Sequence, residues 1–483
     1  MLNNFFYPLT KVRQLSVLVV LTMLICASWL QASYLHAKGS KLYNDKEQVV
    51  RLTGVNWFGL ETSNLGPHGL WKRDYHGMLI QIQKLGFNCV RIPFCDAMLR
   101  EGAEVQSINF YGEDPYYPRD ITELNKELQG LKPIEILDEI IRYAGQLGLV
   151  IILDNHSREP DGYMNEKVWY TETTSEEQWI KNWVSLAKRY KNNPTVIGFD
   201  LENEPHAKIA DGGSSWGLGA KSDWNVAAEK CGNAILAENP DVLIIIEGVE
   251  QYGSTVYWWG GNLRGVKTAP IKLSKPEKLV YSPHEYGPEV FQQPWFDSPD
   301  FPKNMEAIWD DAFGFIVKEN IAPLLVGEFG IKDMKSYEGK SGTWFTTFLK
   351  YMADNFYSWT FWCFNPNSGD TGGMLSYDWV TIEQWKLDAV KPWCAPLINE
   401  PAAVRVISTK NKQQTKLTIA NKQINCDMNL KGKQRLDIIN MKGQIVRSYS
   451  SLPVPIKLSA SGTYLAVLYN NSKPVEKLRF MVD

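Results

Sequence analysis

Short apolar runs alternate with longer segments of helical spacing through the first 400 residues. The apolar positions in each run are consecutive, which is typical of strands buried on both faces, as in parallel sheets. Apolar residues between positions 134 and 144, and again between 179 and 190, recur at the spacing of an amphipathic helix. Eight runs are predicted to form strands: Leu52–Trp57, Phe87–Phe94, Leu149–Asp154, Val196–Glu202, Val242–Glu247, Leu279–His284, Pro323–Glu328 and Trp359–Phe364.

Eight such strand–helix repeats predict an α/β protein, a closed (β/α)8 TIM barrel. The competing architecture is an open, doubly wound sheet. That fold usually carries a glycine-rich phosphate turn after its first strand, and the chain has none there. The pattern therefore favours the barrel.

A second pattern begins near Pro401, where short strand-like runs with intervening turns predict a small β-sandwich. Residues 401–483 contain 14 Lys and Arg but only 4 Asp and Glu, a formal charge of +10. Since the whole chain carries −3, residues 1–400 carry −13. The basic charge suggests contact with an anionic surface, and a solvated basic face is the alternative. The predicted strands are 416–419, 435–440, 444–449, 463–469 and 477–482, with a turn at 441–443.

The N-terminus has the layout of an export signal: basic residues, an apolar run over 15–30, then small residues. Cleavage is expected after Ala32 or Ala37. A membrane anchor is the alternative, but the run is shorter than the roughly 20 residues of a spanning helix. We therefore predict a signal peptide over 1–37, a catalytic barrel over 38–398 and a basic β-sandwich over 402–483. The expected location is secreted or cell-surface, with no stable membrane insertion after signal removal.

Composition narrows the possible partners and cofactors. The chain holds 18 Trp and 22 Tyr, which suit either a large aromatic core or a cleft that stacks flat sugar faces. The near-balanced total charge gives no reason to expect a nucleic-acid partner. The six cysteines beyond the signal are scattered without a CxxC pair, so we expect no metal site and no cofactor.

Polar residues gather at the carboxyl ends of the predicted strands, where barrel enzymes place their chemistry. Glu204 follows the fourth strand within Asn-Glu-Pro, and Glu328 ends the seventh within Gly-Glu-Phe-Gly. Each motif is weak alone, but their joint occurrence in order, at strand ends, is specific. Six further residues are predicted at the same mouth: Arg91, His156, Asn203, His284, Tyr286 and Trp362.

Two carboxylates facing one cleft suit cleavage of a glycosidic bond. Carboxyl groups about 5–5.5 Å apart give retention of anomeric configuration, and a gap of about 6.5–9.5 Å admits water and gives inversion. In this hypothesis Glu204 keeps its proton and acts as acid/base, while ionised Glu328 attacks the anomeric carbon. Arg91 and Tyr286 are expected to hold Glu328, and His284 to tune Glu204.

Other side chains are expected to hold the sugar. Asn203 is suited to the 2-hydroxyl, Trp362 to a stacking floor, and His156 to ordering the cleft. Trp258 and Trp259 are predicted to form a sugar platform. His68 is predicted to line the cleft, with simple packing as its alternative.

Three more strand-end carboxylates are weaker candidates. We expect Asp154 to have a structural hydrogen-bonding role. Glu202 lies two residues before Glu204 and would face the same side of a strand. It would lie deeper, so it is only a minor candidate for the acid. Glu247, at the end of the fifth strand, is a modest candidate.

Several motifs together resemble glycoside hydrolase family 5, over residues of about 40 to 395, and the tracts at 359–362 and 368–373 resemble its bacterial cellulase branch. The resemblance implies a retaining, metal-independent barrel enzyme that cleaves internal β-1,4-glucan bonds. The cleft residues alone leave mannan, xylan or xyloglucan and mixed-linkage glucan open. A non-catalytic polysaccharide-binding barrel and a transglycosylase are further alternatives. The motifs are Gly54–Gly59, Val90–Pro93, Asp200–Pro205, Ser282–Pro288 and Gly327–Gly330.

The C-terminal segment resembles, more weakly, the sorting domains of the type IX secretion system. The matching pieces are Leu436–Gly443 and Leu458–Tyr464. This resemblance implies contact with secretion machinery or the cell surface. Substrate adhesion and plain stabilisation are the alternatives.

Overall fold

The structure is a computed structural model of the chain, which divides into two compact units, residues 1–402 and 403–483. The predicted signal peptide lies almost wholly outside the residues described. These are 34–161, 164–399, 417–420, 423–426, 434–440, 445–450, 454–455, 462–470 and 473–482.

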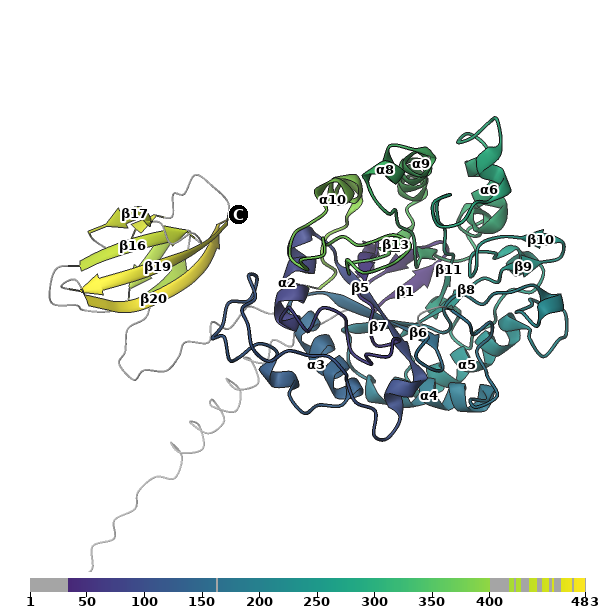
Figure 1. Ribbon diagram of the computed structural model, residues 1–483, viewed down its shortest axis with the longest axis horizontal. Coiled ribbons are helices and arrows are strands. Elements are labelled where there is room, and N and C mark those ends of the chain that lie inside the picture. The colour runs from purple at the N-terminus through teal and green to yellow at the C-terminus, as the bar shows by residue number, and fades with distance from the viewer. Residues whose placement is uncertain are drawn as a thin grey trace, which may run out of the picture. The chain divides into compact units, whose positions relative to one another are not determined.

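All eight predicted barrel strands are present, and every neighbouring pair in their sheet is parallel. The order along the sheet is β11-β8-β7-β6-β5-β4-β13-β12. The predicted (β/α)8 barrel is therefore confirmed (Figure 1). The strands are β4 (Thr53–Asn56), β5 (Cys89–Cys95), β6 (Val150–Ser157), β7 (Val196–Asp200), β8 (Leu243–Glu247), β11 (Leu279–Ser282), β12 (Leu325–Val326) and β13 (Ser358–Phe361).

The barrel closes between β11 and β12 through a sparse set of backbone contacts. Tyr281 N–H donates to the Pro323 carbonyl at 3.1 Å, and Glu285 N–H donates to the Glu328 carbonyl at 3.1 Å. Strand β12 itself is only two residues long. His284 and Glu328 form one of the isolated parallel bridges along this closing seam.

Helices lie around the outside of the strands (Figure 1). The predicted helical segments correspond to α3 and α4, and their apolar faces are buried against the barrel. Ser175 caps α4 by accepting from Gln178 N–H, which satisfies one of the free donors at a helix start. No helix among the described residues is both long and apolar enough to cross a bilayer. The helices are α2 (Tyr75–Leu85), α3 (Pro133–Gln146), α4 (Glu176–Arg189), α5 (Trp224–Glu238), α6 (Met305–Trp309), α7 (Phe315–Lys318), α8 (Met334–Tyr337), α9 (Lys340–Asp354) and α10 (Gln384–Val390).

Five short strands were not predicted within the first unit: β1 (His36–Lys38), β2 (Lys41–Tyr43), β3 (Val49–Val50), β9 (Gln251–Tyr252) and β10 (Thr255–Val256). Strands of two or three residues are too short to show a period. The first three form one antiparallel sheet. Leu35 and Leu42 beside them are buried in the same apolar cluster as the barrel residues Val150 and Leu243.

The second unit contains two antiparallel sheets, in agreement with the predicted β-sandwich. One holds β14 (Leu417–Ala420), β15 (Gln423–Cys426) and β18 (Val454–Pro455). The other has the order β17 (Ile445–Tyr449), β16 (Gln434–Asn440), β19 (Gly462–Asn470) and β20 (Lys473–Val482). Leu436, Asp437 and Ile438 are consecutive in β16 and all buried, and Asp437 accepts from the Ser448 hydroxyl on β17. The predicted turn at 441–443 lies outside the described residues.

Candidate active site

Glu204 is held at the end of β7 by its backbone as well as by its side chain. Its φ of +46° is left-handed, a conformation that costs a non-glycine residue on the order of 1 kcal/mol and persists where the surroundings enforce it. The Glu204 N–H donates to Glu247 Oε2 at 2.8 Å, and the preceding Asn203 N–H donates to the Asn155 carbonyl at 3.0 Å. These contacts aim the Glu204 carboxyl into the barrel mouth.

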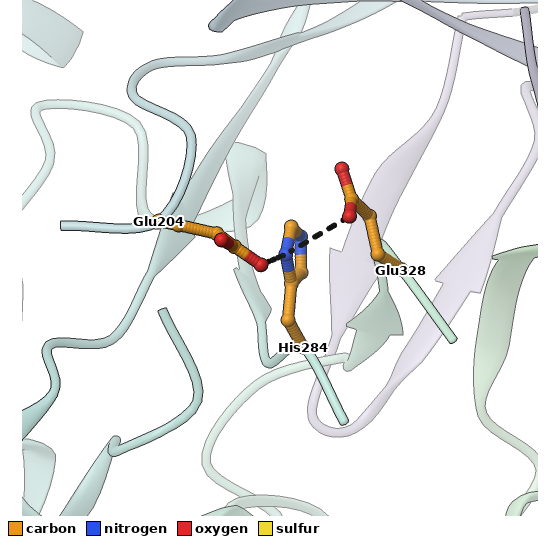
Figure 2. Close-up of side chains that lie close together, drawn as sticks. All are labelled: Glu204, His284 and Glu328. Carbon is orange, nitrogen blue, oxygen red and sulfur yellow. Dashed lines mark hydrogen bonds and ion pairs between the residues drawn. The ribbon is translucent and has the colours of Figure 1, made fainter. Parts of the chain in front are cut away.

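Glu204 and Glu328 face one another across His284 (Figure 2). One ligand atom from each of the three side chains lies within 4.8 Å of the others. His284 Nδ1 is 2.8 Å from Glu204 Oε1 and 3.7 Å from Glu328 Oε2. The Glu204 side chain is 13% exposed and that of Glu328 5%. Both carboxyl groups are therefore close together and reachable from the cleft.

Glu328 is held by two donors. Arg91 Nη1 donates to Oε1 at 2.9 Å, and the Tyr286 hydroxyl donates to Oε2 at 2.6 Å. Both donors are buried. A carboxylate that accepts from a guanidinium and a phenol is stabilised in its ionised form and fixed in orientation.

Arg91 is fully buried beneath the two glutamates, where its planar guanidinium contacts several acceptors at once. It forms ion pairs with Asp200 at 2.9 Å and with Asp154 and Glu247 at 3.1 Å. It also donates to Asn203 Oδ1 at 2.9 Å. A rigid fork of five donors can satisfy such a ring of acceptors, and the single ammonium of lysine cannot.

The pKa values of the three carboxylates around Arg91 shift in different directions. Burial raises the pKa of Asp200 to about 7 and that of Glu247 to about 8, although nearby cations oppose the shift. Despite equal burial, Arg91 and His156 hold the pKa of Asp154 below its usual value. Asp154 is therefore the member of the group that stays ionised most readily.

Both histidines at the mouth are favoured in their charged form. Burial disfavours the imidazolium of His284, but the carboxylates of Glu247 and Glu328 outweigh burial and raise its pKa well above the usual value. Burial likewise opposes protonation of His156, yet Asp154, 2.6 Å from its Nδ1, raises the pKa of His156 to about 9.

Aromatic rings form parallel surfaces beside the glutamates. Trp362 stacks on Phe58 with 5.5 Å between ring centroids and on His156 with 5.8 Å. On the loop after β8, the Trp259 ring is 39% exposed and stacks on His206 at 4.0 Å. Exposed flat rings of this kind suit the apolar faces of sugars.

Two other predicted residues are more enclosed. Trp258 is 7% exposed and meets Tyr286 edge-on at 6.1 Å. His68 bonds Thr62 and Asn367 at 3.0 Å each and packs edge-on against Phe58. Burial lowers the pKa of His68 to about 4, so this ring is neutral near pH 7.

Acidic and histidine donors come close enough to hold a metal ion at two places among the described residues. The first is Glu204, His284 and Glu328, where His284 Nδ1 lies 2.8 Å from Glu204 Oε1 and 3.7 Å from Glu328 Oε2. The second is Asp154, Asp200 and Glu247, which already share the Arg91 guanidinium as their cation.

Sequence reasoning missed two residues of this site. Asp200 ends β7 and pairs with Arg91, and the alternation Asp200-x-Glu202-x-Glu204 was a signal for it. The alternation breaks down because β7 ends at Asp200, so Glu202 points instead to Arg158 Nη1 at 2.6 Å. Phe58 is the other residue that was missed, although its position two residues beyond the end of β4 could have indicated it.

A closed parallel barrel with two facing carboxylates at the carboxyl ends of its strands is the architecture of barrel glycoside hydrolases. Comparison with known proteins agrees with this class. The family model described as cellulase (glycosyl hydrolase family 5) matches residues 44–368. The chain therefore belongs to glycosyl hydrolase family 5 and is a glycoside hydrolase of the cellulase type.

Relatives and solved structures are similar over about three quarters of the chain. An endoglucanase of Paenibacillus polymyxa is 45% identical over 76% of this chain and 88% of its own length. The major extracellular endoglucanase of Xanthomonas campestris pv. campestris is 38% identical over 78% of this chain and 75% of its own. The structure of a hyperthermophilic endocellulase from Pyrococcus horikoshii has a TM-score of 0.68 and 38% identity, covering 76% of this chain and 100% of that one.

Proposed function

We propose that the protein is a retaining endo-β-1,4-glucanase in which Glu204 is the acid/base and Glu328 the nucleophile. The proximity of the two glutamates supports this most directly. One carboxylate oxygen of each lies within 4.8 Å of the other, which suits the separation of about 5–5.5 Å typical of retaining enzymes better than the about 6.5–9.5 Å of inverting ones.

In the first step Glu328 attacks the anomeric carbon while Glu204 gives its proton to the departing glycosidic oxygen. The bond from carbon to the leaving oxygen breaks, and a glycosyl ester forms on Glu328. In the second step Glu204, now ionised, takes a proton from water, whose oxygen attacks the same carbon and releases Glu328. Two displacements return the original anomeric configuration.

The contacts around each carboxyl group fit these roles. Arg91 and Tyr286 donate to Glu328 and aim it, while His284 contacts the Glu204 carboxyl that must exchange a proton. Asn203 lies beside Glu204, where its Oδ1 accepts from Arg91 at 2.9 Å and its Nδ2 donates to Met164 Sδ at 3.7 Å. One amide hydrogen is left to donate to a sugar 2-hydroxyl. Trp362 supplies a flat surface under the ring being cleaved.

The substrate assignment rests on relatives and on the aromatic surfaces. The relatives are named endoglucanases, and the Pyrococcus enzyme has been crystallised with cellotetraose. Trp362 and the exposed Trp259 would contact sugars on either side of the cleaved bond. We therefore place β-1,4-glucan ahead of mannan, xylan, xyloglucan and mixed-linkage glucan as substrate.

The deciding experiment combines polymer assays with two substitutions. A solution of a soluble cellulose derivative should lose viscosity well before reducing ends accumulate. NMR should show that the first product keeps the β configuration. Glu204→Gln and Glu328→Gln should each abolish turnover and still bind cellotetraose. A first product of α configuration, or activity surviving the Glu328 change, contradicts the mechanism. Faster cleavage of mannan or xylan changes the substrate and leaves the mechanism in place.

We also propose that the enzyme is exported and that cleavage follows Ala32. Leu35 is fully buried, its carbonyl accepts from Lys278 Nζ at 2.8 Å, and β1 begins at His36. Cleavage after Ala37 would remove these contacts. The extracellular Xanthomonas relative supports export.

For the basic C-terminal unit we propose sorting to the cell surface. N- and C-terminal sequencing of the mature protein tests both this proposal and the cleavage site.

A further inference from the structure

Glu247 lies at the end of β8, wholly buried beneath the two facing glutamates, and each of its carboxylate oxygens contacts a group that leads to Glu204. Oε2 accepts from the Glu204 main-chain N–H at 2.8 Å. Oε1 is 3.2 Å from His284 Nε2, and the other nitrogen of that ring contacts the Glu204 carboxyl at 2.8 Å. One side chain thus reaches Glu204 at two points, its backbone and its carboxyl group.

Two more contacts join Glu247 to the rest of the mouth. Its Oε1 accepts from Arg91 Nη2 at 3.1 Å, and Arg91 in turn holds Glu328. Gly260, with φ +64°, packs so tightly that a Cβ there would lie 2.2 Å from Glu247 Oε2 and 3.2 Å from the Glu204 Cα. The loop that carries Trp258 and Trp259 is therefore seated on the same carboxyl group.

We propose that Glu247 is a positioning residue for proton transfer, fixing the Glu204 backbone directly and the Glu204 carboxyl through His284. This inference rests on the proposed role of Glu204 as acid/base and adds the residue that aims it. Glu204 needs such support because its left-handed backbone is not held by strand pairing, since β7 ends at Asp200. A small displacement of an acid or base from its productive geometry can cost about 100-fold in rate.

The groups that face Glu247 make glutamine a discriminating replacement. Glu204 N–H, Arg91 Nη2 and His284 Nε2 all approach its oxygens, and the two remaining neighbours are Asp200 and Asp154. Arg91 Nη2 approaches Oε1 and the Glu204 amide approaches Oε2. Since both are donors, the NH₂ group of a glutamine would meet a donor in either orientation. Glu247→Gln keeps the side-chain volume and removes one of the two oxygens that accept hydrogen bonds.

The test compares two aryl β-cellobiosides on the same enzyme preparation. The phenolate of the 2,4-dinitrophenyl compound departs without a proton, whereas that of the phenyl compound needs one. For Glu247→Gln we expect kcat/KM to fall about 10- to 100-fold on the phenyl substrate and less than about threefold on the dinitrophenyl substrate. Since both rates come from one preparation, their ratio does not depend on how much of it is folded. An equal loss on both substrates overturns the proposal.

Three variants make the result interpretable. Glu285→Gln removes a buried carboxyl that accepts from Tyr257, Trp309 and Trp344. Its one neighbour at the mouth is Trp258 and not the Glu204 carboxyl, so any loss should be equal on both substrates. Glu204→Ala must itself separate the two substrates, and if it does not, the proposed function has failed. If Glu204→Ala separates them and Glu247→Gln does not, only the role of Glu247 is refuted. Should Glu247→Gln fail to fold, Glu247→Asp, which keeps the charge but withdraws the oxygens by one methylene, is judged by the same ratio.

Discussion

Replacing Arg91 by lysine keeps the positive charge under the two glutamates and removes the planar fork. The five hydrogen bonds that Arg91 donates end on Asn56, Asp200, Asn203, Glu247 and Glu328. An ammonium group has three donors on one nitrogen and cannot reach acceptors on opposite sides of the site. At least two buried acceptors would therefore lose their partner.

Each unsatisfied buried acceptor costs about 1–3 kcal/mol, so Arg91→Lys should lower the free energy of unfolding by roughly 2–6 kcal/mol. Activity should fall independently of stability, because the Glu328 carboxylate would lose the donor that aims it. Displacement of a reacting group by about 1 Å can cost about 100-fold, and we expect a loss of that order in kcat/KM on folded enzyme.

Urea unfolding followed by circular dichroism, together with kcat/KM on cellotetraose below the transition, measures both effects. Arg100→Lys is the matched control, because Arg100 pairs with Glu159 at the surface, where the two side chains are 50% and 43% exposed. Such a pair contributes no more than about 1 kcal/mol. If Arg91→Lys stays within about 1 kcal/mol of wild type and within about threefold in activity, the buried guanidinium is not needed for stability or for turnover.

Three other outcomes are expected. Trp259→Ala should raise KM for cellotetraose about threefold to tenfold and leave the melting temperature unchanged. The reason is that Trp259 is 39% exposed and its stacking on His206 is a surface contact. An unchanged KM would show that Trp259 is not part of the sugar-binding surface. Asp154 raises the pKa of buried His156 from 6.5 to about 9, so the stability that this pair provides is complete below about pH 6.5 and is lost as pH rises through 9. His156→Gln should therefore reduce the fall in unfolding free energy over that range by up to about 3 kcal/mol, and an identical fall in variant and wild type refutes the linkage. The cysteines at 89, 95, 231, 363 and 394 are all free thiols, so dithiothreitol should leave the melting temperature of the barrel unchanged, and a drop would reveal a disulfide.

The barrel and its mouth were predictable because they depend on strong, repeated signals. Consecutive apolar runs located all eight strands, and reading the polar residue at each carboxyl end brought Arg91, Glu204, His284 and Glu328 to one place. The length of strand β12 was overestimated, since the apolar run at 323–328 forms only two residues of paired strand. On either side of it, Leu324 and Glu328 form only isolated bridges, to Tyr281 and His284.

The sequence did not predict which buried side chains pair with one another beneath the site. Asp200 and Glu202 look equivalent along the chain, yet one pairs with Arg91 and the other with Arg158. The difference arises from the left-handed turn at Glu204 and the end of β7, which no local pattern encodes. Likewise Glu247 was only a modest candidate, because its contacts come from β5, β7 and the end of β11, which are distant in sequence.

The barrel's closing seam has a consequence for how the enzyme fails on heating. Where β11 meets β12, few backbone bonds join the strands, and Glu328 and His284 belong to the pairing itself. Regions with few such bonds open locally at a lower free energy than the whole domain. Loss of turnover should therefore precede melting of the helices, with the enzyme becoming inactive while most of its fold is still intact.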